Sequence, residues 1–574
     1  MEAVVRSADG SWLQFARPSR IVQTGDAGRV GYIISTVEEL TRTGSSWAVG
    51  FVAFEAGAAY GLCVHDPLDL PLAWFAIFEE GPVRFQDLSE WCAGTGGPPP
   101  QLGPMRPTLT AEGFERGFDR IKEHIARGNT YQANYTFRLD GMFSGDPRQL
   151  FAHLVRSQRG QYSAFIRTGD LAICSASPEL FFRRSGRHLT ARPMKGTSPR
   201  GRTLAEDHSL RDRLRSSPKE RAENVMIVDM MRNDIGRVAA VGSVSVPELF
   251  AVERYPTVWQ MTSRVSAETD ATLAELFAAL HPSASVTGAP KVRTMEILAG
   301  LEPGPRGIYT GAIGYVSPAG EAQFNVAIRT ALLDERRGLV SFGVGSGIVW
   351  DSSASAEYEE CLLKGAVLSR AVPDFDLLET VRWTPAEGFY LLGRHLRRIS
   401  ESAEYFQFEY DERRVNDELS RSVAGASAPQ RVRLLVSPLG AARVECTPLH
   451  APTGPARISL ADAPVSRNDV FLYHKTTNRA IYDRARKGGA DDVCLWNEDG
   501  EITESTIANI VVELDGRRVT PPVDCGLLAG TFRDELLERG DLTERVVLRD
   551  ELRRADRIWL INSVQGWRPA ALTG

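Results

Sequence analysis

Short apolar runs typical of strands alternate with helical stretches through most of this chain, but without a regular period. Trp47–Phe54 and Trp74–Phe78 have the composition of strands, whereas Glu112–Ala126 has the apolar spacing of an amphipathic helix. A doubly wound sheet would require strands and helices in steady alternation, which this pattern lacks. The sequence therefore predicts an α+β fold.

Two breaks divide the chain. A stretch rich in Gly and Pro is expected to be an irregular loop, and a second change occurs near Val372–Asp374. After that change, Asp-Gly pairs at 499–500 and 515–516 predict hairpin turns. We therefore expect an N-terminal part at 1–92, the loop at 93–107, a central core at 108–371 and a smaller α+β domain at 374–574.

Charge and cysteine content exclude several classes of protein. Lys plus Arg number 67 against 73 for Asp plus Glu, so the net charge is −6 and no basic face for nucleic acid is expected. No stretch of about 18 apolar residues predicts a membrane span, and the first residues do not have the pattern of a secretory signal. Seven cysteines without a CxxC pair fit a reduced compartment. We expect a cytoplasmic protein that binds neither nucleic acid nor membrane.

A lysine between Pro and Gly is the first candidate for chemistry. Lys195 stands in Arg-Pro-Met-Lys-Gly-Thr, where Pro restricts the backbone and Gly196 allows close approach of a ligand. A lysine held there could act as a nucleophile if burial lowers its pKa. Glu179, beside an apolar pair, could be an acid or base with a raised pKa. Taken singly, each could equally be an ordinary surface residue.

Three glutamates form a second candidate group. Ser217 and Pro218 predict a helix start, and Glu223 lies close to it. Glu357 and Glu360 are three residues apart on another predicted helix and therefore share one face. Three carboxylates make a hard oxygen site suited to Mg²⁺. Solvated helix charges remain the alternative for each residue alone.

Six motifs occur along the chain in a fixed order. They are Ser177-Pro-Glu, Pro193-Met-Lys-Gly-Thr, Glu223-Asn…Arg232-Asn-Asp, Ser285-Val-Thr-Gly-Ala-Pro-Lys, Ile328-Arg-Thr and Gly343…Glu360. Together they resemble the chorismate-utilising family over about 110–371, and 1–92 resembles its looser N-terminal part. The resemblance implies a β-sandwich core with surrounding helices.

The same resemblance implies roles for individual residues. Lys195 would add covalently to the chorismate ring, and Glu179 would transfer protons. Mg²⁺ would be bound by Glu223, Glu357 and Glu360. The residues implied to grip the substrate are Thr287, Tyr309, Arg329, Gly345, Ser346, Gly347 and Gln260.

Two positions refine that resemblance. A lysine at 195 is typical of the members that aminate chorismate at C4, whereas anthranilate synthases carry a small residue there. Gln260 stands where the family usually has His, so a titrating group is lost, although the amide can still form hydrogen bonds.

The C-terminal segment carries a second lysine and a second carboxylate. Asp469–Lys475 has the pattern of a strand ending in a lysine, and Glu504 follows about 30 residues later. Gly530 precedes a predicted helix at Arg533–Arg539, whose start could hold a phosphate. Arg398 lies on a predicted helix at Leu391–Phe406.

As a set, these residues resemble the class IV (fold-type IV) pyridoxal-phosphate family. The resemblance implies that Lys475 binds pyridoxal 5'-phosphate covalently and that Glu504 pairs with its ring nitrogen. The phosphate would be held by Arg398, the Thr531 and Phe532 amides and Ser563. The family's opening segment is reduced here to Asp376–Thr380, so this domain is N-terminally shortened.

Together, the two resemblances imply successive reactions. The first domain would aminate chorismate at C4, and the second would release 4-aminobenzoate and pyruvate for folate synthesis. The chain has no glutaminase elbow, so ammonia would come from a separate glutamine amidotransferase subunit or from free ammonium. The alternatives are an anthranilate synthase-like or specialised-metabolite enzyme, with a C-terminal aminotransferase or a non-catalytic scaffold domain.

Overall fold

A computed structural model describes residues 1–93, 100–370, 373–451, 454–486 and 489–573. The chain forms two compact units. One comprises Met1–Pro199 and Arg211–Val372, and the other comprises Arg200–Leu210 and Pro373–Gly574. The second unit thus includes a short segment, 200–210, from within the predicted central core. Residues 94–99 of the predicted loop lie outside the described residues.

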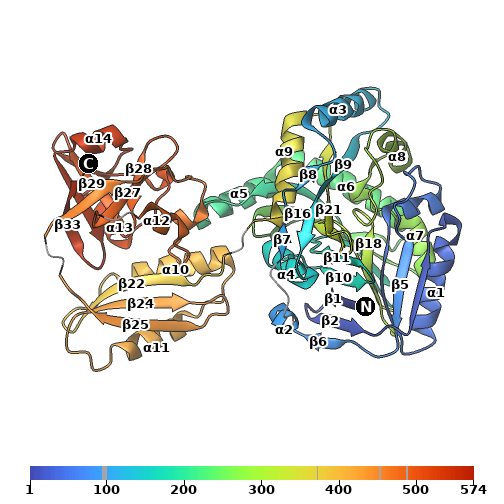
Figure 1. The fold of residues 1–574 in the computed structure, drawn as a ribbon, viewed down its shortest axis with the longest axis horizontal. Coiled ribbons are helices and arrows are strands. Elements are labelled where there is room, and N and C mark those ends of the chain that lie inside the picture. The colour runs from blue at the N-terminus through green and yellow to red at the C-terminus, as the bar shows by residue number, and fades with distance from the viewer. Residues whose placement is uncertain (94–99, 371–372, 452–453, 487–488, 574) are drawn as a thin grey trace. The chain divides into compact units, whose positions relative to one another are not determined.

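The first unit is built on two large antiparallel sheets (Figure 1). The larger sheet has the order β17 (Gly288–Ala289), β9 (Gln132–Ser144), β21 (Leu339–Ile348), β20 (Thr330–Asp334), β11 (Leu171–Ser175), β10 (Ala164–Thr168), β1 (Glu2–Arg6), β2 (Trp12–Ala16) and β6 (Val83–Phe85), with β7 (Gln101–Leu102) and β8 (Arg106–Pro107) paired to β9. The second has the order β14 (Met194–Pro199), β16 (Val258–Glu268), β13 (His188–Arg192), β12 (Leu180–Ser185), β19 (Ala322–Val326), β18 (Ala312–Val316), β4 (Trp47–Val52), β5 (Ala73–Phe78) and β3 (Arg20–Thr24), with β15 (Ser245–Arg254) paired to β16.

Helices complete this unit. They are α1 (Val30–Arg42), α2 (Leu88–Ala93), α3 (Ala111–Ala126), α4 (Pro147–Gln158), α6 (Pro218–Gly236), α7 (Leu273–Leu280), α8 (Lys291–Ala299) and α9 (Ala354–Gly365), while α5 (Leu204–Ser216) runs from one unit into the other. Phe15, Phe51 and Ile313 belong to a core formed by strands of both sheets. Separate cores join each sheet to helices. The predicted β-sandwich core with surrounding helices is confirmed.

Local signals in the sequence explain several element boundaries. The Ser217 hydroxyl accepts a hydrogen bond from the Glu220 amide and caps α6, as the sequence predicts. The predicted helix at 112–126 is α3. The segment expected to be an irregular loop nevertheless contains β7 and β8, because its non-Gly residues pair with the neighbouring strand β9.

The second unit has two smaller sheets. One has the order β23 (Gly388–Phe389), β22 (Leu377–Thr384), β24 (Gln430–Val436) and β25 (Ala442–Pro448). The other has the order β28 (Ile502–Ser505), β27 (Asp492–Trp496), β26 (Ala456–Leu460), β33 (Gly566–Leu572), β32 (Arg557–Asn562), β29 (Asn509–Leu514), β30 (Arg517–Thr520) and β31 (Thr543–Glu544). The helices are α10 (Leu392–Phe406), α11 (Glu412–Ser422), α12 (Ala480–Ala485), α13 (Thr531–Glu538) and α14 (Arg549–Arg554).

The α+β prediction for this unit is confirmed, and both predicted Asp-Gly turns join antiparallel neighbours. The predicted strand ending at Lys475 is wrong. That segment contains a short 3-10 helix, Val470–Leu472, because the Asp469 carboxylate accepts a hydrogen bond from the Phe471 amide and starts a helical turn. In the part of the chain that the structure describes, no helix is long and apolar enough to cross a membrane.

Candidate functional site

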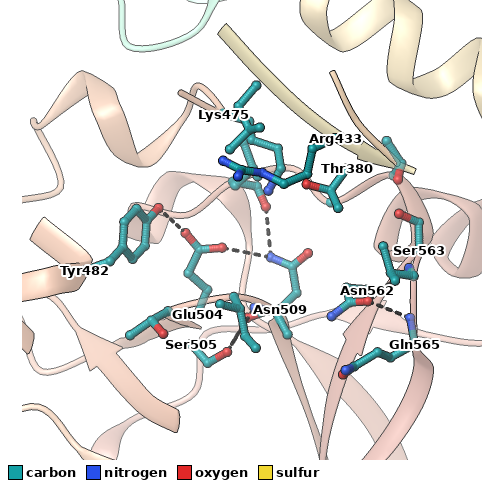
Figure 2. Close-up of a pocket in the computed structure, with 18 of the residues that line it drawn as sticks. Thr380, Arg433, Lys475, Tyr482, Glu504, Ser505, Asn509, Asn562, Ser563 and Gln565 are labelled. Atoms are coloured by element: carbon teal, nitrogen blue, oxygen red, sulfur yellow. Dashed lines mark hydrogen bonds between the residues drawn. The ribbon is translucent and has the colours of Figure 1, made fainter. Parts of the chain in front are cut away.

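The second unit contains a cavity of about 550 Å³ lined by both of its sheets. Lys475 and Glu504 both contribute to its wall, as Figure 2 shows. The cavity is also lined by Arg398, Thr531 and Ser563 from the predicted set. Phe532 is not among the lining residues, although it lies at the start of α13.

Lys475 is held at the cavity wall by its backbone. Its carbonyl accepts a hydrogen bond from the Leu378 amide at 2.9 Å, which ties it to the start of β22. Burial and, to a lesser extent, the Arg398 guanidinium lower the pKa of Lys475 to about 8. A substantial fraction of this amine is therefore neutral near physiological pH, as a nucleophilic lysine requires.

Glu504 is a buried carboxylate on β28 with two side-chain donors. The Tyr482 hydroxyl donates to its Oε1 at 2.8 Å, and Asn509 Nδ2 donates to its Oε2 at 3.3 Å (Figure 2). Burial raises the pKa of Glu504 to about 7, and the Tyr482 hydrogen bond opposes that rise. A positively charged ring nitrogen placed against this carboxylate would favour its ionised form.

The predicted phosphate-binding arginine is anchored by a second buried acid. Arg398 donates to the two oxygens of Glu379 through Nε and Nη2, each at 2.8 Å, and through Nη1 to the Ala529 carbonyl at 2.9 Å. Burial opposes ionisation of Glu379, but Arg398 and His395 together hold its pKa well below the usual range. Arg398 therefore lies at the cavity in a fixed orientation next to the start of α13.

In the first unit, Lys195 lies beside the carboxylate of Glu223 and the backbone of Gly347. Its Nζ is 3.2 Å from Oε2 of Glu223 on α6. A Cβ added at Gly347 would lie only 2.8 Å from that Nζ, so the glycine leaves room for the end of the lysine side chain beside β21. Lys195, Glu223 and Gly347 are thus brought together.

Hydrogen bonds fix the strand that carries Lys195. Asn224 Nδ2 donates to the Lys195 carbonyl at 3.0 Å. Gln260 Nε2 donates to the Gly196 carbonyl at 2.8 Å, while the Thr197 hydroxyl donates to Gln260 Oε1 at 3.1 Å. Gln260 therefore supports the backbone beside Lys195, a role that does not require a titrating side chain.

Glu179 is buried in the turn before β12. The Ser177 hydroxyl accepts a hydrogen bond from the Glu179 amide at 3.2 Å and so orders this turn. Burial raises the pKa of Glu179 to about 8, and the amide of Met194, the residue before Lys195, partly offsets that rise. Glu179 is therefore protonated at neutral pH and close to the strand of Lys195.

The three glutamates predicted to bind Mg²⁺ each have another partner. Glu223 pairs with Lys195, the Ser346 hydroxyl bonds to Glu357, and Lys364 Nζ lies 2.6 Å from Glu360. Burial opposes ionisation of Glu360, but Lys364 and, more weakly, Lys195 lower its pKa. Among the described residues, no three acidic, His or Cys side chains are grouped closely enough to hold a metal ion.

Of the residues predicted to bind the substrate, some contact β21 or Lys364, whereas Thr287 bonds within its own turn. Tyr309 packs directly against Gly343 of β21, and Arg329 Nη1 donates to the Lys364 carbonyl at 3.1 Å. Lys364 Nζ also donates to the Gly345 carbonyl at 2.8 Å. The Thr287 hydroxyl already donates to the Ser283 carbonyl at 3.2 Å, so it supports its own turn.

Sequence reasoning missed several residues at both sites. In the first unit these are Lys364 and Asn224, and in the second they are Tyr482 and Asn509. Lys364 lies four residues after Glu360, a spacing that predicts a helical ion pair and could have been noticed. The contact of Asn224 joins residues on different elements, and no local pattern predicts it, whereas Asn509 lies five residues after Glu504 and faces it across a hairpin.

A lysine among glutamates in a two-sheet unit and a lysine cavity in a separate α+β unit define an enzyme with two sites. The chain belongs to the chorismate binding enzyme family, whose sequence profile matches residues 29–370, more than half of the chain. Residues 376–572 match the profile of amino-transferase class IV.

Individual relatives match the first unit. Aminodeoxychorismate synthase component 1 of Klebsiella aerogenes is 44% identical over 257 residues, covering 44% of this chain and 56% of that protein. Its counterpart from Escherichia coli K12 is 43% identical over 302 residues, covering 52% of this chain and 63% of that protein. The crystal structure of anthranilate synthase component I from Streptococcus pneumoniae TIGR4 is similar at 25% identity and a TM-score of 0.52, covering 64% of this chain and 90% of that one. The chain thus spans less than two thirds of the length of these two curated relatives.

Proposed function

We propose that this chain makes 4-aminobenzoate from chorismate in two steps. The first unit aminates chorismate to 4-amino-4-deoxychorismate, and the second converts that product to 4-aminobenzoate and pyruvate. The observation that carries the proposal is the pair of lysines: Lys195 among carboxylates beside Gly347, and Lys475 in a cavity with Glu504. The synthase names of the relatives and the class IV match support the order of the steps.

In the first step, Lys195 adds to ring carbon C2 of chorismate as the C4 hydroxyl leaves. Glu179 is protonated at neutral pH because burial raises its pKa to about 8, so it can donate the proton that the leaving hydroxyl needs. Ammonia then enters at C4 and displaces the lysine, and water is the other product. Gln260 and Asn224 keep the backbone beside Lys195 in place throughout.

Mg²⁺ is part of the proposal for this step. Glu223, Glu357 and Glu360 would hold it, since three carboxylates form the hard oxygen donor set that Mg²⁺ prefers. The ion supplies positive charge for the substrate carboxylate. To bind it, the three side chains would have to come closer together than they lie in the structure and exchange their present partners, Lys195, Ser346 and Lys364, for the metal.

In the second step, the cavity would hold pyridoxal 5'-phosphate. Lys475 offers an amine whose pKa is lowered to about 8, and Glu504 offers a carboxylate for the ring nitrogen. Arg398, Thr531 and Ser563, which line the cavity, would hold the phosphate together with the Phe532 amide at the start of α13. The bound cofactor acts as an electron sink. Lys475, with its amine lining the same cavity, would move the protons as pyruvate leaves and the ring becomes aromatic.

The proposal also places the chain in its cellular context. The ammonia for the first step would come from a glutamine amidotransferase subunit or from free ammonium. The product is the aromatic part of folate, and we infer a cytoplasmic location. The low cysteine content, seven residues in the chain without a CxxC pair, supports a reducing compartment.

Product analysis tests this proposal. The purified chain is supplied with chorismate, Mg²⁺, ammonium and pyridoxal 5'-phosphate, and the products are separated by chromatography. We expect 4-aminobenzoate and pyruvate in equal amounts, without any added 2-oxoacid. Anthranilate as the product would contradict the first step. A requirement for a 2-oxoacid acceptor would show that the second unit is an aminotransferase instead.

A further inference from the structure

The wall of the second-unit cavity carries more positive charge than the cofactor needs. Five arginines line the cavity, and Glu504 is its one acidic lining residue among those that the structure describes. The arginines are Arg398, Arg431, Arg433, Arg479 and Arg486. A cofactor phosphate at the start of α13 accounts for Arg398 but not for the other four.

Two of the remaining arginines form hydrogen bonds to Thr506, which also lines the cavity. Arg479 donates to the Thr506 carbonyl, and Arg486 Nε donates to the Thr506 hydroxyl at 3.3 Å. The Arg479 guanidinium also lies over the Tyr482 ring, 4.6 Å from its centroid. These two arginines therefore help to order the loop around Thr506.

Arg431 and Arg433 are different. They are two residues apart on β24, so both side chains lie on one face of the sheet. Arg433 lies opposite Thr380 and Arg431 lies opposite Thr447, and both threonines also line the cavity. Figure 2 shows Arg433 beside Thr380, on the same side of the cavity as Lys475. This sheet face therefore forms one wall of the site.

The opposite face of the same sheet is apolar. Val432, Leu434 and Val436 alternate with the two arginines and pack into a core with α10 and α11. That alternation fixes the register, because a shift of one residue would bury the guanidinium groups in this core. The register of β24 therefore places Arg431 and Arg433 on the sheet face that lines the cavity.

Few contacts neutralise these two arginines. Arg433 Nη1 donates to Glu445 at 3.0 Å, and both side chains are partly exposed. For Arg431, the described residues include no ion-pair partner. The guanidinium groups therefore retain donors that could form paired hydrogen bonds to carboxylate oxygens.

We propose that Arg431 and Arg433 select a substrate with two carboxylate groups, whose amine is presented to Lys475. This rests on the proposed function of the cavity and assigns its specificity to β24. An apolar amino acid would leave two guanidinium groups facing a side chain that cannot pair with them, so such substrates are disfavoured. The second unit would thus act on a dicarboxylate amine rather than on a branched-chain amino acid.

Binding of two simple probes tests the selection independently of turnover. Isophthalate and benzoate differ by one carboxylate, and each is titrated into the protein loaded with pyridoxal 5'-phosphate while the cofactor absorption band is followed. We expect isophthalate to bind about tenfold more tightly than benzoate, as one further charge-assisted hydrogen-bonded pair predicts. The double variant Arg431→Gln/Arg433→Gln should abolish this preference.

Arg443→Gln is the matched control. Arg443 lies on the neighbouring strand β25 and does not line the cavity, so its replacement removes a positive charge from the same sheet and leaves the cavity wall intact. It should leave the isophthalate preference unchanged. An unchanged melting temperature and absorption band verify that each variant is folded and loaded. A double variant that keeps the full preference would overturn the inference.

The experiment also separates this inference from the function on which it rests. Selective isophthalate binding without cleavage of 4-amino-4-deoxychorismate would retain the dicarboxylate selection and reject the lyase reaction. Cleavage at the same kcat/KM in wild type and double variant would retain the lyase reaction and reject the role of Arg431 and Arg433.

Discussion

The two lysine sites of this chain present the same functional group in opposite electrostatic surroundings. Lys195 lies beside Glu223, and Glu360 is close enough for the lysine to lower its pKa. Lys475 is buried, and the Arg398 guanidinium adds to the burial that lowers its pKa. Surroundings rich in carboxylates suit a cation, whereas surroundings rich in arginine suit anionic ligands and a neutral amine.

The difference also appears in how each lysine is positioned. Lys195 depends on the space left by Gly347 and on side chains that bond to its strand, Gln260 and Asn224. Lys475 is fixed through its backbone by a hydrogen bond from Leu378 and lines a cavity together with Glu504. The first site is a close-packed contact, and the second is a preformed chamber for a cofactor.

The largest effect is expected from removing the first lysine. Lys195→Ala should lower 4-aminobenzoate formation from chorismate by about a thousandfold or more, as loss of a covalent nucleophile does elsewhere. Cleavage of supplied 4-amino-4-deoxychorismate should continue, because that reaction depends on Lys475. Both rates are measured by chromatography. Lys219→Ala removes an exposed lysine from α6 and is the control. If Lys195→Ala forms 4-aminobenzoate from chorismate at an undiminished rate, Lys195 is not the nucleophile of the first site.

The second largest effect is expected from chelation of divalent metal, which should slow the reaction of the first site but not that of the second. Addition of EDTA is expected to slow amination by about a hundredfold or more, since a metal ion contributes several kcal/mol of charge stabilisation. Cleavage of 4-amino-4-deoxychorismate should be unaffected, because arginines and not a metal provide the positive charge there. Restoration by Mg²⁺ completes the test. Equal loss of both reactions would contradict the comparison.

A smaller effect is expected from the hydroxyl that supports Glu504. Tyr482→Phe removes the donor to Glu504 Oε1 and should lower the kcat/KM of the cleavage step about tenfold, the value of a hydrogen bond to a charged group. The absorption band of the bound cofactor should shift as well. Tyr410→Phe is the control, because the Tyr410 hydroxyl has no hydrogen-bond partner in the part of the chain that the structure describes. If Tyr482→Phe leaves the absorption band and the cleavage rate unaltered, the Tyr482 hydroxyl does not support Glu504 in the reaction.

The smallest effect is a pH dependence. Burial lowers the pKa of Lys475 to about 8, so the amine is already about half neutral at pH 8. The rate of pyridoxal 5'-phosphate uptake, followed by absorbance, should therefore rise only about twofold between pH 8 and 10. An ordinary lysine with a pKa near 10.4 would show a much steeper rise over that range. Such a rise would mean that the amine is not desolvated before the cofactor binds.

The sequence predicts the architecture well where local signals are strong. The Ser217 cap and the Asp-Gly turns have a local cause, and the structure has α6 and two hairpins at those places. The segment before Lys475 was misread as a strand, because its apolar residues suit either structure and the Asp469 cap decides for a helical turn. An apolar run this short therefore does not distinguish a strand from a helical turn, and the capping residue has to be considered with it.

The sites show a different limit. Lys195, Glu223, Lys475 and Glu504 could be identified from motifs, since each lies in a short distinctive stretch. The partner Tyr482 could not, because it comes from a separate element that meets Glu504 only after folding, whereas Asn509 faces Glu504 across a tight hairpin. The ion pair between Glu360 and Lys364 also could not be weighed against metal binding from spacing alone.

The central claim is that the two lysines serve successive reactions, and a mixing experiment tests it most directly. Lys195→Ala and Lys475→Ala chains are assayed separately and together with chorismate, Mg²⁺, ammonium and pyridoxal 5'-phosphate. We predict that neither chain alone forms 4-aminobenzoate, that Lys475→Ala accumulates 4-amino-4-deoxychorismate, and that the mixture forms 4-aminobenzoate. Formation of 4-aminobenzoate by Lys475→Ala alone, at the wild-type rate, would contradict the account.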